Sequence, residues 1–316
     1  MKRVNLFLLF ILLSFAIRLN GQNYPVSKQP IQILNANKRL GSPEGAVWAH
    51  TEMATDINPV NSANIVIGFN STYPETYPTT ATIGAQYSIN GGTTWGSLNS
   101  LPGADNLGYA SDPGCAFNTN GVVYISYVAY GTGYQDEARY NRSNDGGITW
   151  SNPVTVYTAA PGYGIDRPNI AIDNTVGSPY QNRRYFAWSR SQGGYLTNGI
   201  QFISPDLNNG VQTISNDIGW GVDMDTDLNG KLYVVWCDFN GNLRMNRSLD
   251  GGNSFIGTTT VVSGLINPVN IGDLDARYYP TIAIDKSDFH PNRVYIAYHS
   301  GPSNDVDIFL VYSDDG

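Results

Sequence analysis

A short glycine-rich loop occurs four times in this chain and constrains its fold more than any other feature. It reads YSINGGTTW from Tyr87, RSNDGGITW from Arg142 and RSLDGGNSF from Arg247, and a shorter copy, YSDDG, begins at Tyr312. Glycine takes positive φ in a tight turn at little steric cost, and an Asp or Asn side chain accepts hydrogen bonds from nearby backbone N–H groups. The pattern therefore predicts a turn that holds the fold together, with an aromatic residue that fills space between neighbouring sheets.

Each loop belongs to a longer repeat. A short apolar segment ends in Asn or Asp, a turn follows, and a segment rich in β-branched and aromatic residues comes next, as in CAFNTNGVVYISY from Cys115. The marker residues of the five copies lie 54 to 60 residues apart: Asn58, Asn118, Asp173, Asp227 and Asp285. Segments such as VYISY are apolar on both faces, which is typical of strands packed between other sheets. Four strands in about 55 residues form one antiparallel meander, so the sequence predicts an all-β fold: a β-propeller with five four-stranded blades in this chain and six or more in a complete ring.

Two parts of the chain depart from the regular repeat. The third copy has no clear glycine-rich loop, and FISPDLNNG from Phe202 stands where one belongs. Near the N-terminus, SKQPIQILNA from Ser27 is similar to the fourth-strand sequence SNPVTVYT from Ser151. We expect residues 29–35 to form a strand that closes the ring by completing the last blade. Because the chain stops inside its fourth loop, we also expect it to be a fragment of a longer protein.

Residues 1–21 have the pattern of a secretory signal peptide. Lys2 and Arg3 precede an apolar run from Leu6 to Ile17, which is short for a membrane span, although a membrane anchor is the alternative. We therefore expect a mature domain at 22–316 that is secreted or held at the cell surface, with no membrane span. The net charge of −8 repels phosphate backbones and argues against a nucleic-acid partner. The oligomeric state is left open.

The sequence predicts no metal site and no cofactor, because its histidines and cysteines lack metal-ligand spacing. Export permits a disulfide between Cys115 and Cys237, but both lie in apolar β-type segments, and two buried thiols are the alternative. DMDTDLNG from Asp223 alternates aspartates as a calcium loop does. It has Leu228 and Val234 where a helix-loop-helix site has Gly and Glu, so we predict a strand and a turn there.

The loops resemble the Asp boxes, or BNR repeats, of the sialidase-like (neuraminidase) propeller superfamily, and the resemblance covers about residues 50–316. It implies that the boxes are structural and lie between strands three and four of a blade, on the face away from the active site. Many members of the superfamily are not sialidases. The box residues implied are Ser88, Asn90, Gly92, Trp95, Ser143, Asp145, Gly147, Trp150, Ser248, Asp250, Gly252, Phe255, Ser313 and Asp315.

The face opposite the boxes carries the starts of the first strands and the ends of the second strands. The first-strand starts include His50, Glu52, Asp112, Asp166, Arg167, Trp220, Arg277, Tyr278 and Tyr279. The second-strand ends include Asn70, Tyr127, Tyr130, Trp188, Arg190, Trp236, Asp238, Tyr298 and His299. Aromatic rings stack on sugars and arginines bind carboxylates bidentately, so a glycan site is predicted on this face. Packing between blades is the alternative for the aromatics that occupy equivalent repeat positions: Phe69, Tyr127, Trp188, Trp236 and Tyr298.

A sialidase of this superfamily needs three arginines for the substrate carboxylate, a tyrosine nucleophile with a glutamate partner, and an acid/base aspartate. The resemblance makes Glu52, Asp166 and Tyr279 the candidate catalytic residues. The candidates for substrate binding are Arg167, Arg190, Asp238, Arg277, Tyr278 and His299. The chain lacks the Arg-Ile-Pro hallmark, and its nearest segments are DRPNIAID and RYYPTIAID. The resulting hypothesis is an exported propeller that binds or acts on glycans, of exo-sialidase-like type if it is an enzyme; the alternative is a non-catalytic adhesion or structural propeller at the cell surface.

Overall fold

The computed structural model describes residues 49–72, 81–131, 135–266, 270–271, 274–275, 279–302 and 305–316. The expected signal peptide at 1–21 and the expected ring-closing strand at 29–35 lie outside the described residues.

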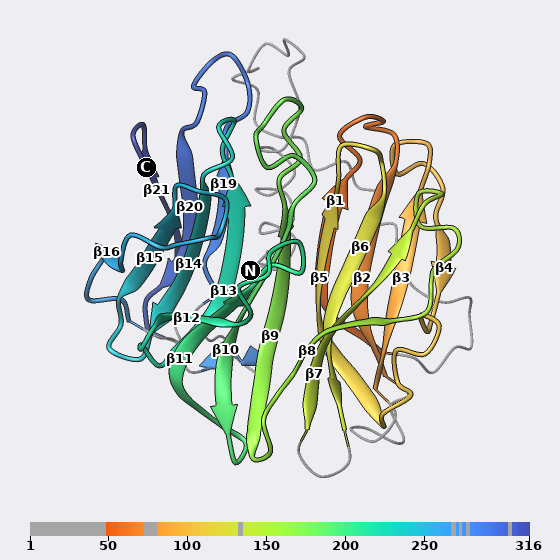
Figure 1. The fold of residues 1–316 in the computed structure, drawn as a ribbon, viewed down its shortest axis with the longest axis horizontal. Helices are drawn as coiled ribbons and strands as arrows, with labels where there is room; N and C mark the ends of the chain where they lie inside the picture. Colours follow the sequence, from red (N-terminus) through yellow and green to blue (C-terminus); the bar gives the residue numbers. More distant parts are fainter. Residues whose placement is uncertain are drawn as a thin grey trace.

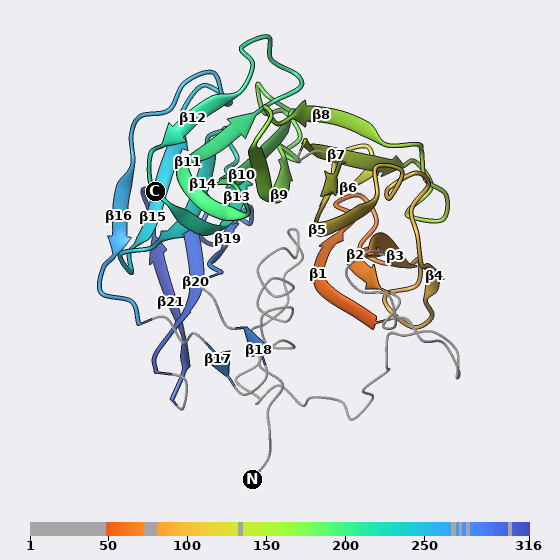
Figure 2. The ribbon, with the colours of Figure 1, turned by 90° about the horizontal axis from the view of Figure 1, so that it is seen from below.

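The described strands form five antiparallel blades, which confirms the predicted all-β propeller (Figure 2). Blade 1 contains β1 (Ala49–Ile57), β2 (Ile65–Thr72), β3 (Thr82–Ser88) and β4 (Gly96–Leu98). Blade 2 contains β5 (Tyr109–Phe117), β6 (Val123–Tyr130), β7 (Asp136–Ser143) and β8 (Val154–Thr158). Blade 3 contains β9 (Tyr163–Ile172), β10 (Arg184–Gln192), β11 (Tyr195–Ile203) and β12 (Gln212–Ser215). Blade 4 contains β13 (Gly219–Thr226), β14 (Leu232–Asp238), β15 (Leu243–Ser248) and β16 (Thr259–Val262). Blade 5 contains β19 (Thr281–Ile284), β20 (Val294–Ser300) and β21 (Asp307–Ser313), and a short hairpin of β17 (Asn270–Ile271) and β18 (Leu274–Asp275) precedes it.

The blades follow one another around a common axis in sequence order. Figure 2 looks along that axis and shows the first strands β1, β5, β9, β13 and β19 nearest the centre, with the fourth strands at the rim. Figure 1 shows the same strands from the side, running along the axis. The first strands are therefore the elements that bring residues from different blades together.

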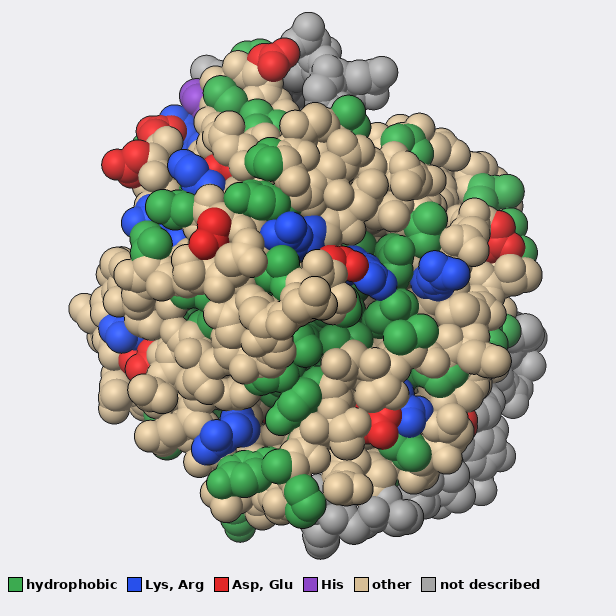
Figure 3. Space-filling model, viewed as in Figure 1, with side chains coloured by type: hydrophobic (Ala, Val, Ile, Leu, Met, Phe, Trp, Pro, Cys, Tyr) green, Lys and Arg blue, Asp and Glu red, His purple; other side chains and the backbone are tan. Residues whose placement is uncertain are grey.

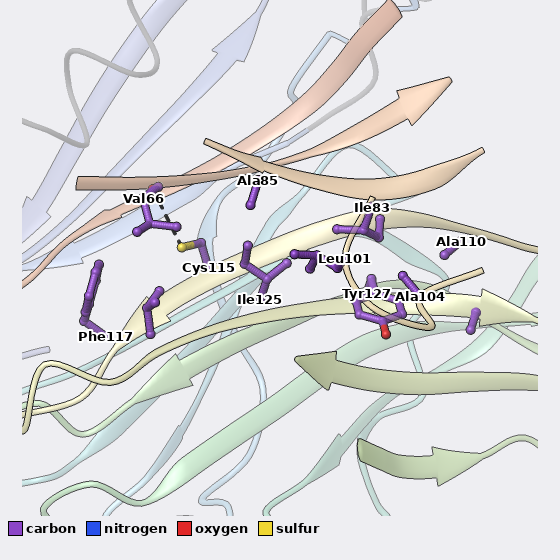
Figure 4. Close-up of a cluster of buried hydrophobic side chains, with 12 residues drawn as sticks. Val66, Ile83, Ala85, Leu101, Ala104, Ala110, Cys115, Phe117, Ile125 and Tyr127 are labelled. Atoms are coloured by element: carbon purple, nitrogen blue, oxygen red, sulfur yellow. Dashed lines mark hydrogen bonds between the residues drawn. The ribbon is translucent and has the colours of Figure 1, made fainter. Parts of the chain in front are cut away.

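The hydrophobic core is divided into clusters that lie between neighbouring blades. The cluster between blades 1 and 2 joins Val66 and Ile83 to Phe117, Ile125 and Tyr127 (Figure 4). Three further clusters join blades 2 and 3, 3 and 4, and 4 and 5. The repeat aromatics of the second strands belong to this core: Phe69, Tyr127, Trp188, Trp236 and Tyr298 are all buried. Packing between blades is thus their role, and they are withdrawn as sugar-stacking candidates.

The glycine-rich loops are closed turns built from their own side chains. In blade 2, the Ser143 hydroxyl accepts the Gly147 amide at 2.8 Å and donates to the Asp145 carboxylate at 2.7 Å. Asp145 also accepts the Thr149 amide at 2.9 Å, and the Trp150 indole N–H donates to the Gly147 carbonyl at 3.0 Å. The loops of blades 1 and 4 repeat the Ser and Asx hydrogen bonds. The first three contacts of the turn therefore recur wherever the sequence pattern is complete.

The irregular third copy has a different structure. Ser204 stands where the loop serine belongs, and its buried hydroxyl has no hydrogen-bond partner among the described residues. Asp206 binds the Arg184 side chain and backbone amide instead of its own turn. Without the Gly-Gly pair of the regular loop, the acidic residue forms an ion pair with Arg184.

The remaining expectations about the interior are settled by burial. Cys115 and Cys237 are both free and buried, so the thiol alternative holds and the disulfide does not. The aspartates of DMDTDLNG lie on β13 and its turn, where they accept backbone amides. On the side seen in Figure 3, charged side chains are scattered among hydrophobic and other side chains.

Candidate functional site

The first strands share one irregular position near their starts. Register shifts interrupt the pairing of β1, β5, β9 and β13 with their second strands there, as β-bulges do. The residue at that position has left-handed backbone: Glu52 at φ 50°, Asp112 at 61°, Arg167 at 54° and Gly221 at 67°. Three of the four carry a side chain, and positive φ is uncommon for such residues. Strain of this kind clusters at functional sites.

Side chains from three of these bulges and from blade 5 meet at one place. The Arg167 guanidinium lies 3.2 Å from a Glu52 carboxylate oxygen and 4.0 Å from an Asp112 carboxylate oxygen. Its central carbon stands 4.1 Å from the centroid of the Tyr279 ring. Asn70 donates to Glu52 at 3.1 Å and accepts the Asp112 amide at 2.9 Å, which ties blade 1 to blade 2. We call Glu52, Asp112, Arg167 and Tyr279 the central group.

The order of blades explains how Arg167 reaches Tyr279. Arg167 belongs to blade 3 and Tyr279 to blade 5, and blade 4 lies between them. Blade 4 has Gly221 at the bulge, so it sends no side chain into the gap. Two residues after Gly221 on β13, Asp223 accepts hydrogen bonds from Asn169 at 2.8 Å and from Thr281 at 2.9 Å, which holds β13 between its two neighbours.

Two carboxyl groups of the central group lie within hydrogen-bond reach of each other. Burial, the hydrogen bond to Glu52 and the nearby charges of Glu52 and Asp166 raise the pKa of Asp112 well above its ordinary value. Burial also acts to raise the pKa of Glu52, but the hydrogen bond from Asp112, the charge of Arg167 and the bond from Asn70 lower it overall. The two shifts therefore favour the protonated form of Asp112 and the charged form of Glu52, which faces Arg167.

The groups around Arg167 favour its positively charged form. Burial lowers the pKa of the guanidinium, but Tyr279, Glu52 and Asp112 raise it above its ordinary value. The Glu52 and Arg167 side chains are 39% and 27% exposed, whereas Asp112 is 12% exposed. A ligand on this face would therefore meet Glu52 and Arg167 first and the less exposed Asp112 beneath them.

An aromatic wall stands beside Asp112. The Tyr109 and Tyr130 rings are stacked, with centroids 4.3 Å apart and planes 16° apart. The Ser111 hydroxyl donates to the Tyr130 hydroxyl at 3.1 Å. Burial raises the pKa of Tyr130 well above its ordinary value, so this ring is neutral at the edge of the central group.

The structure gathers some of the sequence candidates and disperses others. Glu52, Arg167 and Tyr279 are in the central group, and Asp166 is close enough for its charge to act on Asp112. Arg190 lies instead over the Tyr163 ring, 4.7 Å from its centroid. Arg277 and Tyr278 lie outside the described residues.

Two candidates are engaged in the framework of their own blades. Asp238 is 4% exposed and accepts the Asn240 and Asn242 amides at 2.9 Å, so its carboxylate closes the turn after β14. His299 is buried within β20.

Asp112 is the member for which sequence reasoning assigned no role. Its spacing to the marker residue of its blade could have identified it. The same spacing of six residues before the marker holds for all five blades: Glu52, Asp112, Arg167, Gly221 and Tyr279. Three of these five also precede a proline. Among the residues that the structure describes, no group of three or more potential metal-binding side chains occurs. Nor does any helix in that part of the chain have the length and apolar character needed to cross a membrane.

Solved structures with this fold include sialidases. A variant of the NanB sialidase from Streptococcus pneumoniae aligns with a TM-score of 0.56 and 10% identity, over 84% of this chain and 58% of that one. Trypanosoma rangeli sialidase in complex with the inhibitor DANA aligns with a TM-score of 0.55 and 12% identity, over 85% of this chain and 48% of that one. A protein of unknown function from Dyadobacter fermentans aligns with a TM-score of 0.52 and 12% identity, over 84% of this chain and 94% of that one.

No family model and no curated protein matches the chain by sequence. The chain spans 58% of the NanB chain and about half of the trypanosomal sialidase. At 10% to 12% identity, the structural similarity supports a shared fold, and it assigns no function to any residue of this chain. The comparisons thus establish that this chain has the fold of the sialidase propellers.

Proposed function

We propose that this protein binds an uncharged glycan at the central group. The observation that carries the proposal is the convergence of Glu52, Asp112, Arg167 and Tyr279 from four blades on one partly exposed spot. Their carboxyl and guanidinium groups offer hydrogen-bond donors and acceptors for hydroxyl groups, and Tyr279 offers an aromatic ring. The expected signal peptide at 1–21 supports an exported protein that would meet glycans outside the cell.

The charge of the group favours an uncharged ligand over a sialic acid. The Glu52 carboxylate already faces the Arg167 guanidinium, and the raised pKa of Asp112 favours its neutral form. Asp166 adds negative charge nearby. Arg190, the second described arginine candidate, lies on Tyr163, so the described residues do not form a cluster of three arginines around one point. A ligand carboxylate would have to displace Glu52 from Arg167, which a neutral sugar hydroxyl need not do.

Glycan binding by the purified full chain tests the proposal. On an array of uncharged and sialylated oligosaccharides, we expect binding to uncharged members, and calorimetry with the selected sugar should give a measurable Kd. Arg167→Ala should weaken that binding about tenfold or more, since a hydrogen bond to a charged group contributes about 1.5–3 kcal/mol. Tyr279→Ala should weaken it through the loss of the aromatic contact.

Matched controls lie on the turn that joins β19 and β20 in blade 5. Phe289 is 73% exposed and Asp288 is exposed, so Phe289→Ala and Asp288→Asn should leave the affinity unchanged. Thermal unfolding of each variant checks that the fold is intact. Binding confined to sialylated members, or wild-type affinity in both central variants, would overturn the proposal.

Glycoside hydrolysis is a second candidate, favoured by one observation. A carboxyl group that keeps its proton beside a carboxylate is the arrangement of a general acid, and Asp112 beside Glu52 has it. Against it, the carboxyl groups of glycosidases stand about 5–9.5 Å apart to admit the sugar and water, whereas these two are in contact. Fluorogenic galactosides, glucosides and sialosides distinguish the candidates: turnover that Asp112→Asn abolishes would make hydrolysis the function, and its absence leaves binding.

A further inference from the structure

We propose that Trp220 and Phe239 form a second sugar-binding subsite beside the central group, so that the protein takes a glycan of at least two units. The inference rests on the proposed function and extends it from one sugar ring to a chain. It starts from an aromatic pair in blade 4, the exposed Phe239 and the partly exposed Trp220, which is not part of the central group.

The two rings form a fixed platform at one end of the blade. Their centroids are 4.3 Å apart and their planes are inclined by 44°. Phe239 is 51% exposed, and Trp220 is partly exposed. The Phe239 amide donates to the Ile218 carbonyl at 3.0 Å, and Asp238 closes the turn that follows. The loop is therefore held by its backbone, and the rings need little ordering when a ligand binds.

The platform lies next to the central group along the chain and across the blades. Trp220 directly precedes Gly221, the residue at the bulge where neighbouring blades contribute Glu52, Asp112 and Arg167. The Asp223 hydrogen bonds to Asn169 and Thr281 hold β13 between the strands that carry Arg167 and Tyr279. The blade that sends no side chain into the central group thus carries a large aromatic residue directly before its bulge position.

The chemistry of the pair suits the C–H face of a pyranose. Aromatic rings with one side in water are enriched where an apolar body meets a polar surrounding, and flat rings bury much area at low entropic cost. Trp188 and Trp236 are fully buried in the core, and the partly exposed Trp95 and Trp150 belong to the glycine-rich loops, whereas the partly exposed Trp220 lies at the start of a first strand. A second sugar unit stacked on Trp220 would cover the pair while the first unit stays in the central group.

Calorimetry with two length series tests the subsite: glucose, cellobiose and cellotetraose, and galactose, lactose and lacto-N-tetraose. In the series that binds, we expect affinity to rise about tenfold or more from one unit to four. Trp220→Ala should abolish this rise and leave the affinity for the single sugar unchanged, with Phe239→Ala showing a smaller loss. Trp220→Phe should keep most of the rise, and Phe289→Ala should keep all of it.

The outcomes separate the two proposals. If Tyr279→Ala removes binding but Trp220→Ala keeps the wild-type ratio between four units and one, the central site stands and the second subsite is wrong. If neither series nor any other uncharged oligosaccharide binds, the proposed function is wrong and the subsite falls with it. Unfolding midpoints of Trp220→Ala and Trp220→Phe show whether a loss reflects the fold, and equal loss for single and longer sugars would also contradict the subsite.

Discussion

At the scale of single residues, the charge of the central group depends on which of two neighbouring carboxyl groups is more readily protonated. Glu52 and Asp112 are close enough to share a proton, and they differ in what surrounds them. Glu52 faces Arg167 and Asn70, which favour its charged form, whereas Asp112 is more deeply buried. Two carboxyl groups with the same chemistry therefore have opposite pKa shifts because of position alone.

This difference predicts opposite effects of two isosteric substitutions. A raised pKa at Asp112 means that the native state keeps a proton that the unfolded chain releases, so this group lowers stability as pH rises above its ordinary value of 3.8. Asp112→Asn should remove that loss and leave the protein at least as stable as wild type at pH 7. Glu52→Gln removes the carboxylate opposite Arg167 and should cost about 1 kcal/mol at pH 7, since the pair is partly exposed.

Urea unfolding at pH 4 and pH 7 measures both effects. The lowered pKa of Glu52 means that its contribution is present above its ordinary value of 4.5 and fades as pH falls, so the cost of Glu52→Gln should shrink at pH 4. Asp288→Asn serves as the control at an exposed site. A larger loss at pH 7 in Asp112→Asn than in Glu52→Gln would place the charge on the other carboxyl group.

At the scale of elements, each glycine-rich loop has the same internal structure but a different neighbour. Gly92 and Gly147 occupy the same loop position in blades 1 and 2, with φ of 84° and 97°. A Cβ on Gly92 would meet only the Trp95 ring of its own loop, at 3.6 Å. A Cβ on Gly147 would stand 2.9 Å from Val66 and 2.9 Å from Tyr87, in the preceding blade. The second loop thus packs against another blade as well as closing its own turn.

Alanine at these two glycines should therefore have unequal effects. Gly92→Ala should cost about 1–2 kcal/mol, the penalty of a left-handed backbone for a residue with a Cβ. Gly147→Ala should cost about 1–3 kcal/mol more, because the methyl group also overpacks the interface with blade 1. Free energies of unfolding from urea titrations compare them, and equal losses would show that Gly147 has no tighter packing than Gly92.

At the scale of the whole molecule, side chains of one first strand bind the backbone of the next. Asp56 accepts the Phe117 amide at 2.8 Å between blades 1 and 2, and Asp225 accepts the Ile284 amide at 2.9 Å between blades 4 and 5. Both aspartates are buried. Since the hydrophobic clusters also lie between blades, each blade depends on its neighbours for both its core and its polar partners.

Removing one of these hydrogen bonds between blades should make local opening easier in the adjacent blade only. Asp225→Ala leaves the Ile284 amide without its acceptor and should speed hydrogen exchange at β19 by about 10- to 100-fold, as expected for a lost hydrogen bond of about 1.5–3 kcal/mol to a charged group. Exchange in β5 and β6 should stay unchanged, and Asp288→Asn should change neither. Hydrogen exchange followed by mass spectrometry measures this, and equal acceleration in all blades would contradict a local link.

The local sequence pattern determined much of this protein by itself. The spacing of Asn58, Asn118, Asp173, Asp227 and Asp285 was sufficient for the repeat, the four-stranded meander and the face that carries the strand starts, because turns and alternation are local properties of a chain. It was also sufficient to place Glu52, Arg167 and Tyr279 on that face. Only the tertiary structure decided which of these residues meet. The contact of Arg167 with Tyr279 across Gly221, the opposite pKa shifts of Glu52 and Asp112, and the burial of Trp236 in a blade whose Trp220 is partly exposed depend on how strands far apart in the chain pack around the axis. No local pattern contains that information.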